Sequence, residues 1–281
     1  MGKGIQSFQQ KIVLITGGSS GIGLALAQVL SQMGARLWLL ARRDSELSNA
    51  IKQLNNPTDH RKIAADVSDW TQVESAIKKI EAERGLPDLI INSAGVTHPG
   101  YVQDIPIEIF HEMIEINYLG TVHVIKAVMQ GMIARRSGYI VNISSTAGFI
   151  GVYGYSAYGA SKYAVRGFSD VLRSELKPLG IGVSIAFPPD TDTPQLAYEN
   201  KFKPFETKAL TGTAKVLSPQ VVAQEIIRGV QRGRYVIIPG LENKLIYRLV
   251  SLFGDGVYPI LDTMIANARR SGQSKNSKLN S

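Results

Sequence analysis

Short aliphatic runs alternate with amphipathic stretches along most of this 281-residue chain. The aliphatic runs are the predicted strands, at residues 12–15, 36–40, 62–65, 89–91, 139–143, 182–186 and 235–238. Between them, apolar residues recur at helical spacing near 21–33, 45–54, 70–83, 106–134, 156–177 and 218–231. Apolar strands that alternate with helices are typical of a parallel sheet covered on both faces. The pattern predicts an α/β fold: a doubly wound, Rossmann-like sheet of about seven strands in a three-layer α/β/α sandwich.

The first predicted strand leads directly into the glycine-rich segment TGGSSGIG at residues 16–23. Glycines permit a sharp turn and a close approach of the backbone, and the helix that follows offers free N–H groups to a pyrophosphate. An ordinary glycine-rich turn is the alternative, and the strand–turn–helix context argues against it. The predicted dinucleotide contacts are Gly17, Ser19, Ser20, Gly21, Ile22 and Gly23.

The end of the second predicted strand indicates which dinucleotide binds. A cofactor with a free ribose 2′-hydroxyl usually meets an Asp or Glu at this point. Here the strand ends at Ala41, and Arg42 and Arg43 follow. Guanidinium groups suit a phosphate better than a hydroxyl, so the sequence predicts NADP(H) as the cofactor. The alternative is that both arginines are solvated loop charges.

Residues at the ends of the third and fourth strands complete the predicted cofactor site. Asp66 and Val67 follow the third strand, where they can meet an adenine edge. Asn92, Ala94 and Gly95 lie at the end of the fourth strand, at the same edge of the sheet. Since Asn, Asp and Gly are common in turns, each motif by itself fits a structural turn equally well.

Tyr158 and Lys162 are four residues apart on a predicted helix and therefore share one face. A nearby ammonium favours the phenolate and lowers the pKa of a tyrosine. Such a tyrosine can give its proton to a ketone oxygen. The alternative is a surface pair without a catalytic role.

Two further polar groups lie near this predicted site. A hydroxyl at Ser144 or Ser145, after the fifth strand, can hydrogen-bond a carbonyl and stabilise developing oxyanion charge. Asn117 lies inside a predicted helix, where Asn is unfavourable unless its side chain is hydrogen-bonded. A buried amide with a purely structural role is the alternative for Asn117.

Together these motifs resemble the short-chain dehydrogenase/reductase family over about residues 10–240. The matching segments, in family order and spacing, are TGGSSGIG (16–23), NSAG (92–95), Asn117, ISSTAG (143–148) and YGASK (158–162). The resemblance implies that Tyr158 is the acid/base, and that Lys162 lowers the tyrosine pKa and binds the nicotinamide ribose. It also selects Ser145 over Ser144 for the substrate carbonyl and gives Asn117 a water that links Lys162 to a proton relay.

The PPDTDTP loop after the sixth strand resembles that of the 3-ketodihydrosphingosine reductases in this family. The resemblance implies NADPH-dependent reduction of 3-ketodihydrosphingosine to dihydrosphingosine, with Pro188, Thr191 and Thr193 near the nicotinamide. This long-chain lipid is an amino ketone, so Asp190 or Asp192 is our hypothesis for ammonium recognition, and a rigid Asp/Thr turn is the alternative. Reduction of another carbonyl (3-oxoacyl thioester, steroid or xenobiotic ketone) and a non-catalytic dinucleotide-binding scaffold remain alternatives for the whole chain.

The net charge of +8 comes from 31 Lys+Arg against 23 Asp+Glu, and all of it lies in residues 201–281, which hold 13 basic and 5 acidic side chains. A neutral main body argues against a nucleic-acid partner. Within residues 241–270, apolar side chains recur at helical spacing beside basic ones: Leu241, Leu245, Leu249, Leu252 and Phe253, with Lys244 and Arg248. This pattern predicts an amphipathic basic extension at a membrane interface. A helix that caps the domain, or a subunit contact, is the alternative.

These features predict a catalytic domain over residues 1–240, the extension over 241–270 and a disordered polar tail over 271–281. With no cysteine and four histidines that lack ligand spacing, no metal site is expected. The sequence has no secretory signal. Residues 12–35 and 137–161 are uncharged and longer than the roughly 20 residues of a spanning helix, but both are rich in Gly, Ser and Asn and fit a strand, a loop and a helix, so no membrane-spanning helix is predicted. We therefore expect a cytoplasmic protein that contacts the cytosolic face of a membrane, the endoplasmic reticulum in a eukaryote. The resemblance implies a homodimer or homotetramer.

Overall fold

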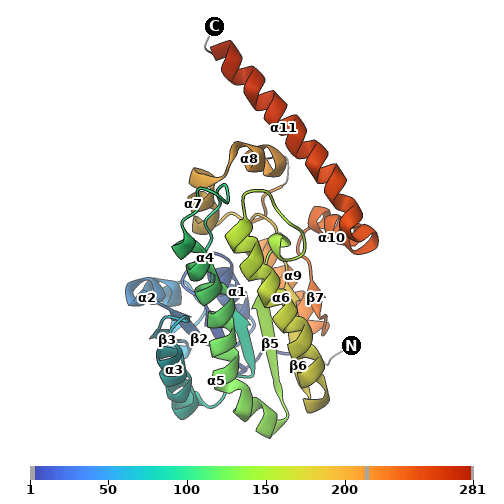
Figure 1. Ribbon diagram of the computed structural model, residues 1–281. Coiled ribbons are helices and arrows are strands. Elements are labelled where there is room, and N and C mark those ends of the chain that lie inside the picture. Colours follow the sequence, from blue (N-terminus) through green and yellow to red (C-terminus); the bar gives the residue numbers. More distant parts are fainter. Residues whose placement is uncertain (1–3, 213–214, 280–281) are drawn as a thin grey trace.

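The computed structural model describes residues 4–212 and 215–279, and a parallel sheet forms its centre (Figure 1). The strands are β1 (Ile12–Thr16), β2 (Arg36–Ala41), β3 (Arg61–Ala64), β4 (Leu89–Asn92), β5 (Gly138–Ile143), β6 (Ile181–Ala186) and β7 (Val236–Ile237). They lie in the order β3-β2-β1-β4-β5-β6-β7, and each neighbouring pair is parallel. The predicted doubly wound sheet is confirmed, because each predicted strand coincides with an observed one.

Helices cover both faces of the sheet because successive strand residues point to opposite sides. One face carries α1 (Gly21–Gln32), α2 (Asp44–Lys52) and α9 (Pro219–Gln231), and the other carries α3 (Trp70–Arg84), α5 (Gly120–Arg135) and α6 (Ser156–Leu176). Val13 and Ile15 of β1 pack on the first face, and Leu14 between them packs on the second. All three side chains are fully buried. The predicted three-layer sandwich is therefore confirmed as well.

The single helix predicted over residues 106–134 has three parts. They are α4 (Ile107–Met113), a π-helical turn (Ile114–Leu119) and α5. π-Helical turns inside longer helices often occur at functional sites. The spacing of apolar residues does not reveal the π-helical turn, because one wider helical turn leaves the apolar residues on the same side of the helix.

Two short helices follow β6 in a segment for which the sequence predicted none: α7 (Pro194–Phe202) and α8 (Phe205–Thr211). Thr193 is the N-cap of α7, and its hydroxyl accepts the N–H of Leu196 at 3.3 Å. Pro194 occupies the first helical position, where its missing N–H costs nothing. A capping Thr followed by Pro is the local signal of this helix start.

The extension contains α10 (Leu241–Phe253), a 3₁₀ turn (Gly254–Val257) and α11 (Tyr258–Leu279), and α11 extends away from the body of the molecule (Figure 1). The stretch Leu241–Arg270 has 30 residues and contains an 18-residue window with a mean hydropathy of 1.3, enough by length and composition to cross a membrane. It is not one straight helix, because Gly254 has φ 52° and ends α10. At 1.5 Å per residue α10 rises about 20 Å, less than the roughly 30 Å of a hydrocarbon core.

The inner face of α10 packs on the domain. Asn243 is 3% exposed and donates to the carbonyl of Phe187 at 2.7 Å. The ring of Tyr247 lies 5.0 Å from that of Phe149, centroid to centroid. The sequence pattern therefore changes at the predicted boundary, residue 240, but α10 beyond it packs against the catalytic domain.

The far end of the extension also differs from the prediction. Arg269 of α11 pairs with Glu206 of α8 at 2.9 Å, and Glu206 also accepts the hydroxyl of Tyr101 at 2.9 Å. The α11 backbone stays helical to Leu279, whereas we predicted a disordered tail from residue 271. Once a helix is nucleated, each added residue gains one hydrogen bond, so polar composition alone does not end it. Residues 280–281 lie outside the described residues.

Candidate active site

A cavity of about 1130 Å³ lies along the carboxyl ends of the strands. Most of the predicted cofactor residues line it: Gly17, Ser19, Ser20, Gly21, Ile22, Gly23, Arg42, Arg43, Asp66, Val67, Ala94, Gly95, Tyr158, Lys162, Pro188, Thr191 and Thr193. Another part of its wall is apolar and comes from α10 and α11, including Leu249, Val250, Phe253, Ile260, Leu261 and Met264. One cavity therefore joins the predicted dinucleotide site to an apolar region.

The glycine-rich turn between β1 and α1 leaves no room for side chains. Gly17 has φ 65°, and a Cβ there would lie 2.9 Å from the backbone of Ala94. A Cβ on Gly23 would lie 2.3 Å from the carbonyl oxygen of Gly17. Ser20, the N-cap of α1, makes no side-chain cap hydrogen bond, so the first N–H groups of the helix stay available to a ligand. The turn lies where the strand order reverses, and its shape fits a pyrophosphate.

The end of β4 is held against this turn, but one predicted contact points elsewhere. The hydroxyl of Thr16 accepts the N–H groups of Ser93 and Ala94, both at 3.1 Å. Asn92 is 3% exposed, donates to Asn142 of β5 at 2.9 Å and does not line the cavity. Its side chain joins two strands inside the sheet, so a cofactor contact by Asn92, as we predicted, cannot come from that side chain.

Arg42 and Arg43 are both exposed at the end of β2. The guanidinium of Arg43 is paired with Glu46 at 2.6 Å. Arg42 forms no ion pair with another residue of the described ranges. Arg42 is therefore the more available of the two for a phosphate. Asp66 also lines the cavity, and its carboxylate already accepts the N–H and hydroxyl of Ser68 at 2.9 and 2.7 Å.

Tyr158 and Lys162 lie one turn apart on α6 and are buried, at 7% and 5% exposure. The Lys162 Nζ lies 5.6 Å from the centroid of the Tyr158 ring and donates to the carbonyl of Ile143 at 3.1 Å. Ser145 lies near enough to the phenol of Tyr158 to oppose the rise of its pKa, and both side chains line the cavity. The hydroxyl of Ser144 instead donates to the backbone carbonyl of Lys162 at 3.0 Å. Of the two serines, Ser145 is the one near the phenol.

Burial sets the proton equilibria of this pair. Burial raises the pKa of the Tyr158 phenol, the charge of Glu199 raises it further, and hydrogen bonds from Ser145 and Gln195 oppose the rise. Burial also lowers the pKa of the Lys162 ammonium to about 8. The structure thus differs from the expectation that Lys162 lowers the tyrosine pKa, because desolvation outweighs an ammonium 5.6 Å from the ring. At neutral pH Tyr158 is a protonated phenol, able to donate.

Asn117 lies behind the cavity, in the π-helical turn. Its side chain accepts the N–H of Val96 at 2.8 Å and donates to the Val96 carbonyl at 3.0 Å and to the Ser161 hydroxyl at 2.9 Å. A Cβ on Gly95 would lie 3.1 Å from the Asn117 Oδ1 and 3.3 Å from the Lys162 Nζ. Asn117 therefore holds the loop after β4 against α6, next to Lys162.

The PPDTDTP loop separates the two aspartates proposed for substrate binding. Thr191 is 5% exposed and its hydroxyl donates to the carbonyl of Pro189 at 2.8 Å. Asp190 lines the cavity and pairs with Lys203 at 3.0 Å. Asp192 is exposed and does not line the cavity. Only Asp190 is thus placed near the site.

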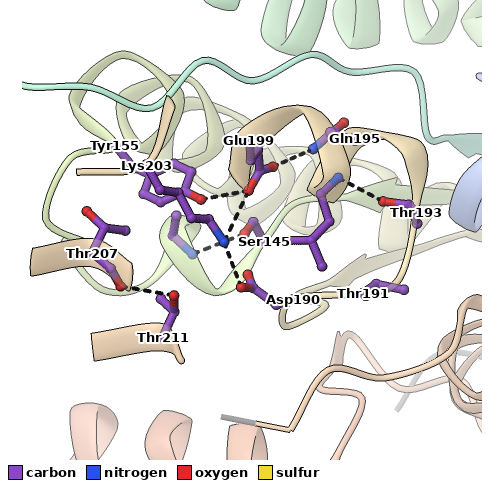
Figure 2. A network of polar contacts seen from close by, with 12 residues as sticks. Ser145, Tyr155, Asp190, Thr191, Thr193, Gln195, Glu199, Lys203, Thr207 and Thr211 are labelled. Carbon is purple, nitrogen blue, oxygen red and sulfur yellow. Dashed lines mark hydrogen bonds and ion pairs between the residues drawn. The ribbon is translucent and has the colours of Figure 1, made fainter. Parts of the chain in front are cut away.

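Four further polar side chains to which the sequence did not point form a connected group: Tyr155, Gln195, Glu199 and Lys203 (Figure 2). The first three line the cavity together with Tyr158. The Tyr155 hydroxyl donates to Glu199 at 2.6 Å, and the Gln195 amide donates to Glu199 at 3.2 Å. Gln195 and Glu199 lie on α7 and Lys203 is the C-cap residue of that helix, so its Thr-Pro start was the signal that could have revealed this network.

Comparison with known proteins places this geometry in context. Residues 11–204 match the family described as short chain dehydrogenase. A 3-ketodihydrosphingosine reductase of Bos taurus is 37% identical over 258 residues, which cover 90% of this chain and 76% of that protein. A 3-dehydrosphinganine reductase of Danio rerio is 41% identical over 229 residues, 79% of this chain and 69% of that protein. The crystal structure of an actinorhodin polyketide ketoreductase variant with NADPH superposes with a TM-score of 0.74 at 27% identity, covering 83% of this chain and 97% of that one.

Proposed function

Since the chain belongs to the short-chain dehydrogenase family, we propose that it is an NADPH-dependent reductase that converts 3-ketodihydrosphingosine to dihydrosphingosine. The observation that carries the proposal is the continuity of the cavity, which runs from the glycine turn and Arg42 past Tyr158 to the apolar residues of α10 and α11. A dinucleotide needs the part of the wall formed by the glycine turn and Arg42, and a long-chain ketone needs the apolar part. The proton donor, Tyr158, must lie between the two parts. Reductases of this ketone are also among the relatives most similar in sequence.

In this proposal the glycine turn and the amino terminus of α1 bind the pyrophosphate, and Arg42 binds the 2′-phosphate. The bound NADPH supplies a hydride for the carbonyl carbon. In the same proposal Lys162 holds the nicotinamide ribose, and Pro188, Thr191 and Thr193 contact the carboxamide. These four residues line the same cavity as Arg42.

Ser145 and Tyr158 act on the carbonyl oxygen. The Ser145 hydroxyl donates to that oxygen and stabilises the charge that develops on it. Tyr158, whose raised pKa keeps it protonated, then donates its proton to complete the alcohol. The Lys162 ammonium stabilises the resulting phenolate from the same helix face. Asn117, next to Lys162, is proposed to hold the water through which the proton is replaced.

A panel of ketones tests the substrate assignment. We expect kcat/KM for 3-ketodihydrosphingosine, followed by NADPH consumption, to exceed that for a 3-oxoacyl thioester or a steroid ketone by at least about tenfold, because the apolar wall and the polar site both contribute to recognition. Equal or greater activity on another ketone would contradict the substrate assignment and leave the family assignment intact. No activity on any ketone, with NADPH bound, would favour a non-catalytic scaffold.

We further propose that the outer face of α10 and α11 contacts a membrane surface at the cytosolic side. Leu245 and Leu252 are 58% and 76% exposed and do not line the cavity, and exposed apolar side chains of this kind mark interaction surfaces. The apolar wall of the cavity comes from the same two helices, so a lipid substrate could reach the site along them. Of the predicted basic flanks, Lys244 is paired with Glu225 at 2.6 Å, while Arg248 is exposed.

Liposome flotation tests this contact. Replacing Leu245 and Leu252 together with Ser should weaken partition into anionic liposomes by at least about 100-fold, because two apolar side chains lose their burial in the lipid. The matched control replaces Val102 and Ile107 with Ser, since they are 62% and 63% exposed but lie outside α10 and α11. A truncation at residue 240 is unsuitable, because it removes the buried Asn243. Equal flotation of the two double variants, or none by the wild type, would contradict the proposal.

We also propose a homodimer or homotetramer. On α6, Tyr163 and Val171 are 40% and 55% exposed and offer apolar area to a second copy. Ala157 and Ser161 on the same helix are buried within the chain and are unavailable for such a contact. Light scattering that gives a monomeric mass would contradict this part of the proposal.

A further inference from the structure

The polar network under α7 is a buried group of charges that faces the cavity. Glu199 and Lys203 lie one helical turn apart, and their side chains are 8% and 2% exposed. Asp190, from the loop before α7, is 32% exposed and lines the cavity with Glu199. Figure 2 shows the Lys203 side chain pointing toward both Glu199 and Asp190. Charges this far from water need partners, because isolated buried charges are costly.

The charges in this group do not balance. It holds two carboxylates and, among the described residues, one ammonium, so its formal charge is −1. The Nζ of Lys203 lies 3.0 Å from Asp190 and 3.9 Å from Glu199. Lys203 therefore chiefly neutralises Asp190, and the unbalanced negative charge falls on Glu199.

Glu199 has room for another donor. Its Oε2 accepts the Tyr155 hydroxyl at 2.6 Å, and its Oε1 accepts the Gln195 amide at 3.2 Å. A carboxylate has about four acceptor sites. Burial raises the pKa of Glu199 above its ordinary value, so the folded protein disfavours the charged form of this carboxyl group. A cation bound at the free acceptor site would stabilise the charged form.

The position of Glu199 relative to the phenol defines where that cation would sit. Gln195 donates to Glu199 and lines the same cavity as Tyr158 and Glu199, and Glu199 is close enough to the phenol for its charge to raise the Tyr158 pKa. The rings of Tyr155 and Tyr158 lie 5.8 Å apart, centroid to centroid. A cation on Glu199 would therefore lie next to a carbonyl that accepts a proton from Tyr158.

We propose that Glu199 binds the ammonium group of the substrate and so makes the enzyme selective for ketones with an amine on the adjacent carbon. The inference rests on the proposed reduction of 3-ketodihydrosphingosine, whose amine is on the carbon next to the ketone. Glu199 is then a specificity-determining residue. Asp190 has a positioning role in this scheme, because it holds Lys203 away from Glu199. Asp192, exposed and outside the cavity, has no part in ammonium binding.

The test compares Glu199→Gln with the wild type on two ketones: 3-ketodihydrosphingosine and the same ketone with hydrogen in place of the ammonium. Gln keeps an acceptor for Tyr155 and removes the charge. We expect kcat/KM on the amino ketone to fall at least about 30-fold, as when one partner of a buried ion pair is removed. We expect kcat/KM on the ketone without the amine to change by less than about threefold. Asp192→Asn, which removes a carboxylate outside the cavity, should leave both values within the same limit.

Two results would overturn the inference: an equal loss on both ketones, or an unchanged kcat/KM on the amino ketone. A second measurement on the wild type covers a Glu199→Gln protein that does not fold. A long-chain primary amine should then inhibit at least about tenfold better than the alcohol of equal length, and equal inhibition would overturn the inference. If the wild type reduces neither ketone, the proposed function fails. The shift in melting temperature produced by the amine, compared with the alcohol, then decides ammonium binding on its own.

Discussion

Tyr158→Phe is expected to lower kcat/KM for ketone reduction by about 10³- to 10⁴-fold, the range typical for loss of a general acid. Phe keeps the buried ring and removes only the hydroxyl, which lines the cavity together with Ser145 and Gln195. Burial keeps that hydroxyl protonated at neutral pH, so no other proton on the cavity wall is as well placed for the carbonyl oxygen. NADPH consumption with the keto-lipid is the measurement.

The matched control for this variant is Tyr163→Phe. Tyr163 lies on the same helix, five residues further along, and is 40% exposed outside the main cavity. Its loss should change kcat/KM by less than about twofold, as for most surface substitutions. NADPH binding, followed by fluorescence, should remain in both variants. If Tyr158→Phe retained more than a tenth of the wild-type activity, Tyr158 would not be the proton donor.

Arg42→Glu is expected to reverse the cofactor preference. We expect kcat/KM with NADPH to fall about 100-fold, because charge-assisted hydrogen bonds to the 2′-phosphate are lost and a carboxylate repels it. With NADH the value should change by less than about threefold or rise, since a carboxylate suits a ribose 2′-hydroxyl. Arg42 is the better choice than Arg43, whose guanidinium is already paired with Glu46.

Arg232→Glu provides the control for charge alone. Arg232 is exposed after α9 and does not line the cavity, yet its replacement changes the net charge by the same amount. In Arg232→Glu, kcat/KM with NADPH and kcat/KM with NADH should change equally, and by less than about twofold. An equal loss with NADPH and NADH in Arg42→Glu would contradict the assignment of Arg42 to the 2′-phosphate.

Local patterns in the sequence were enough to predict the sheet and the cofactor edge. Each strand is an uninterrupted aliphatic run, because both faces of a parallel sheet are buried, and such runs are visible without any tertiary information. The glycine turn was equally visible, since the positive φ of Gly17 and the close approach at Gly23 admit no side chain. The four-residue spacing of Tyr158 and Lys162 already implied a shared helix face.

Side-chain direction and burial were beyond the reach of local patterns. Asn92 ends β4 at the expected edge, yet its amide turns toward Asn142 of the neighbouring strand. The pKa of Tyr158 depends on how far the folded chain excludes water, and desolvation reverses the direction expected from Lys162 alone. Neither property can be derived from the order of residues.

The sequence by itself determined the fold class, the glycine turn, the arginines after β2 and the pairing of a tyrosine with a lysine, because each depends on residues close together along the chain. Only the tertiary structure brought Glu199 into the same cavity wall as Tyr158 and left its charge without a close ionic partner. The tertiary structure also placed α10 and α11 along the wall of that cavity. Those contacts join segments far apart in sequence, and they form only when the whole domain packs. The chemistry of reduction was therefore predictable from local motifs, whereas substrate recognition depends on the packing of the segments after β6.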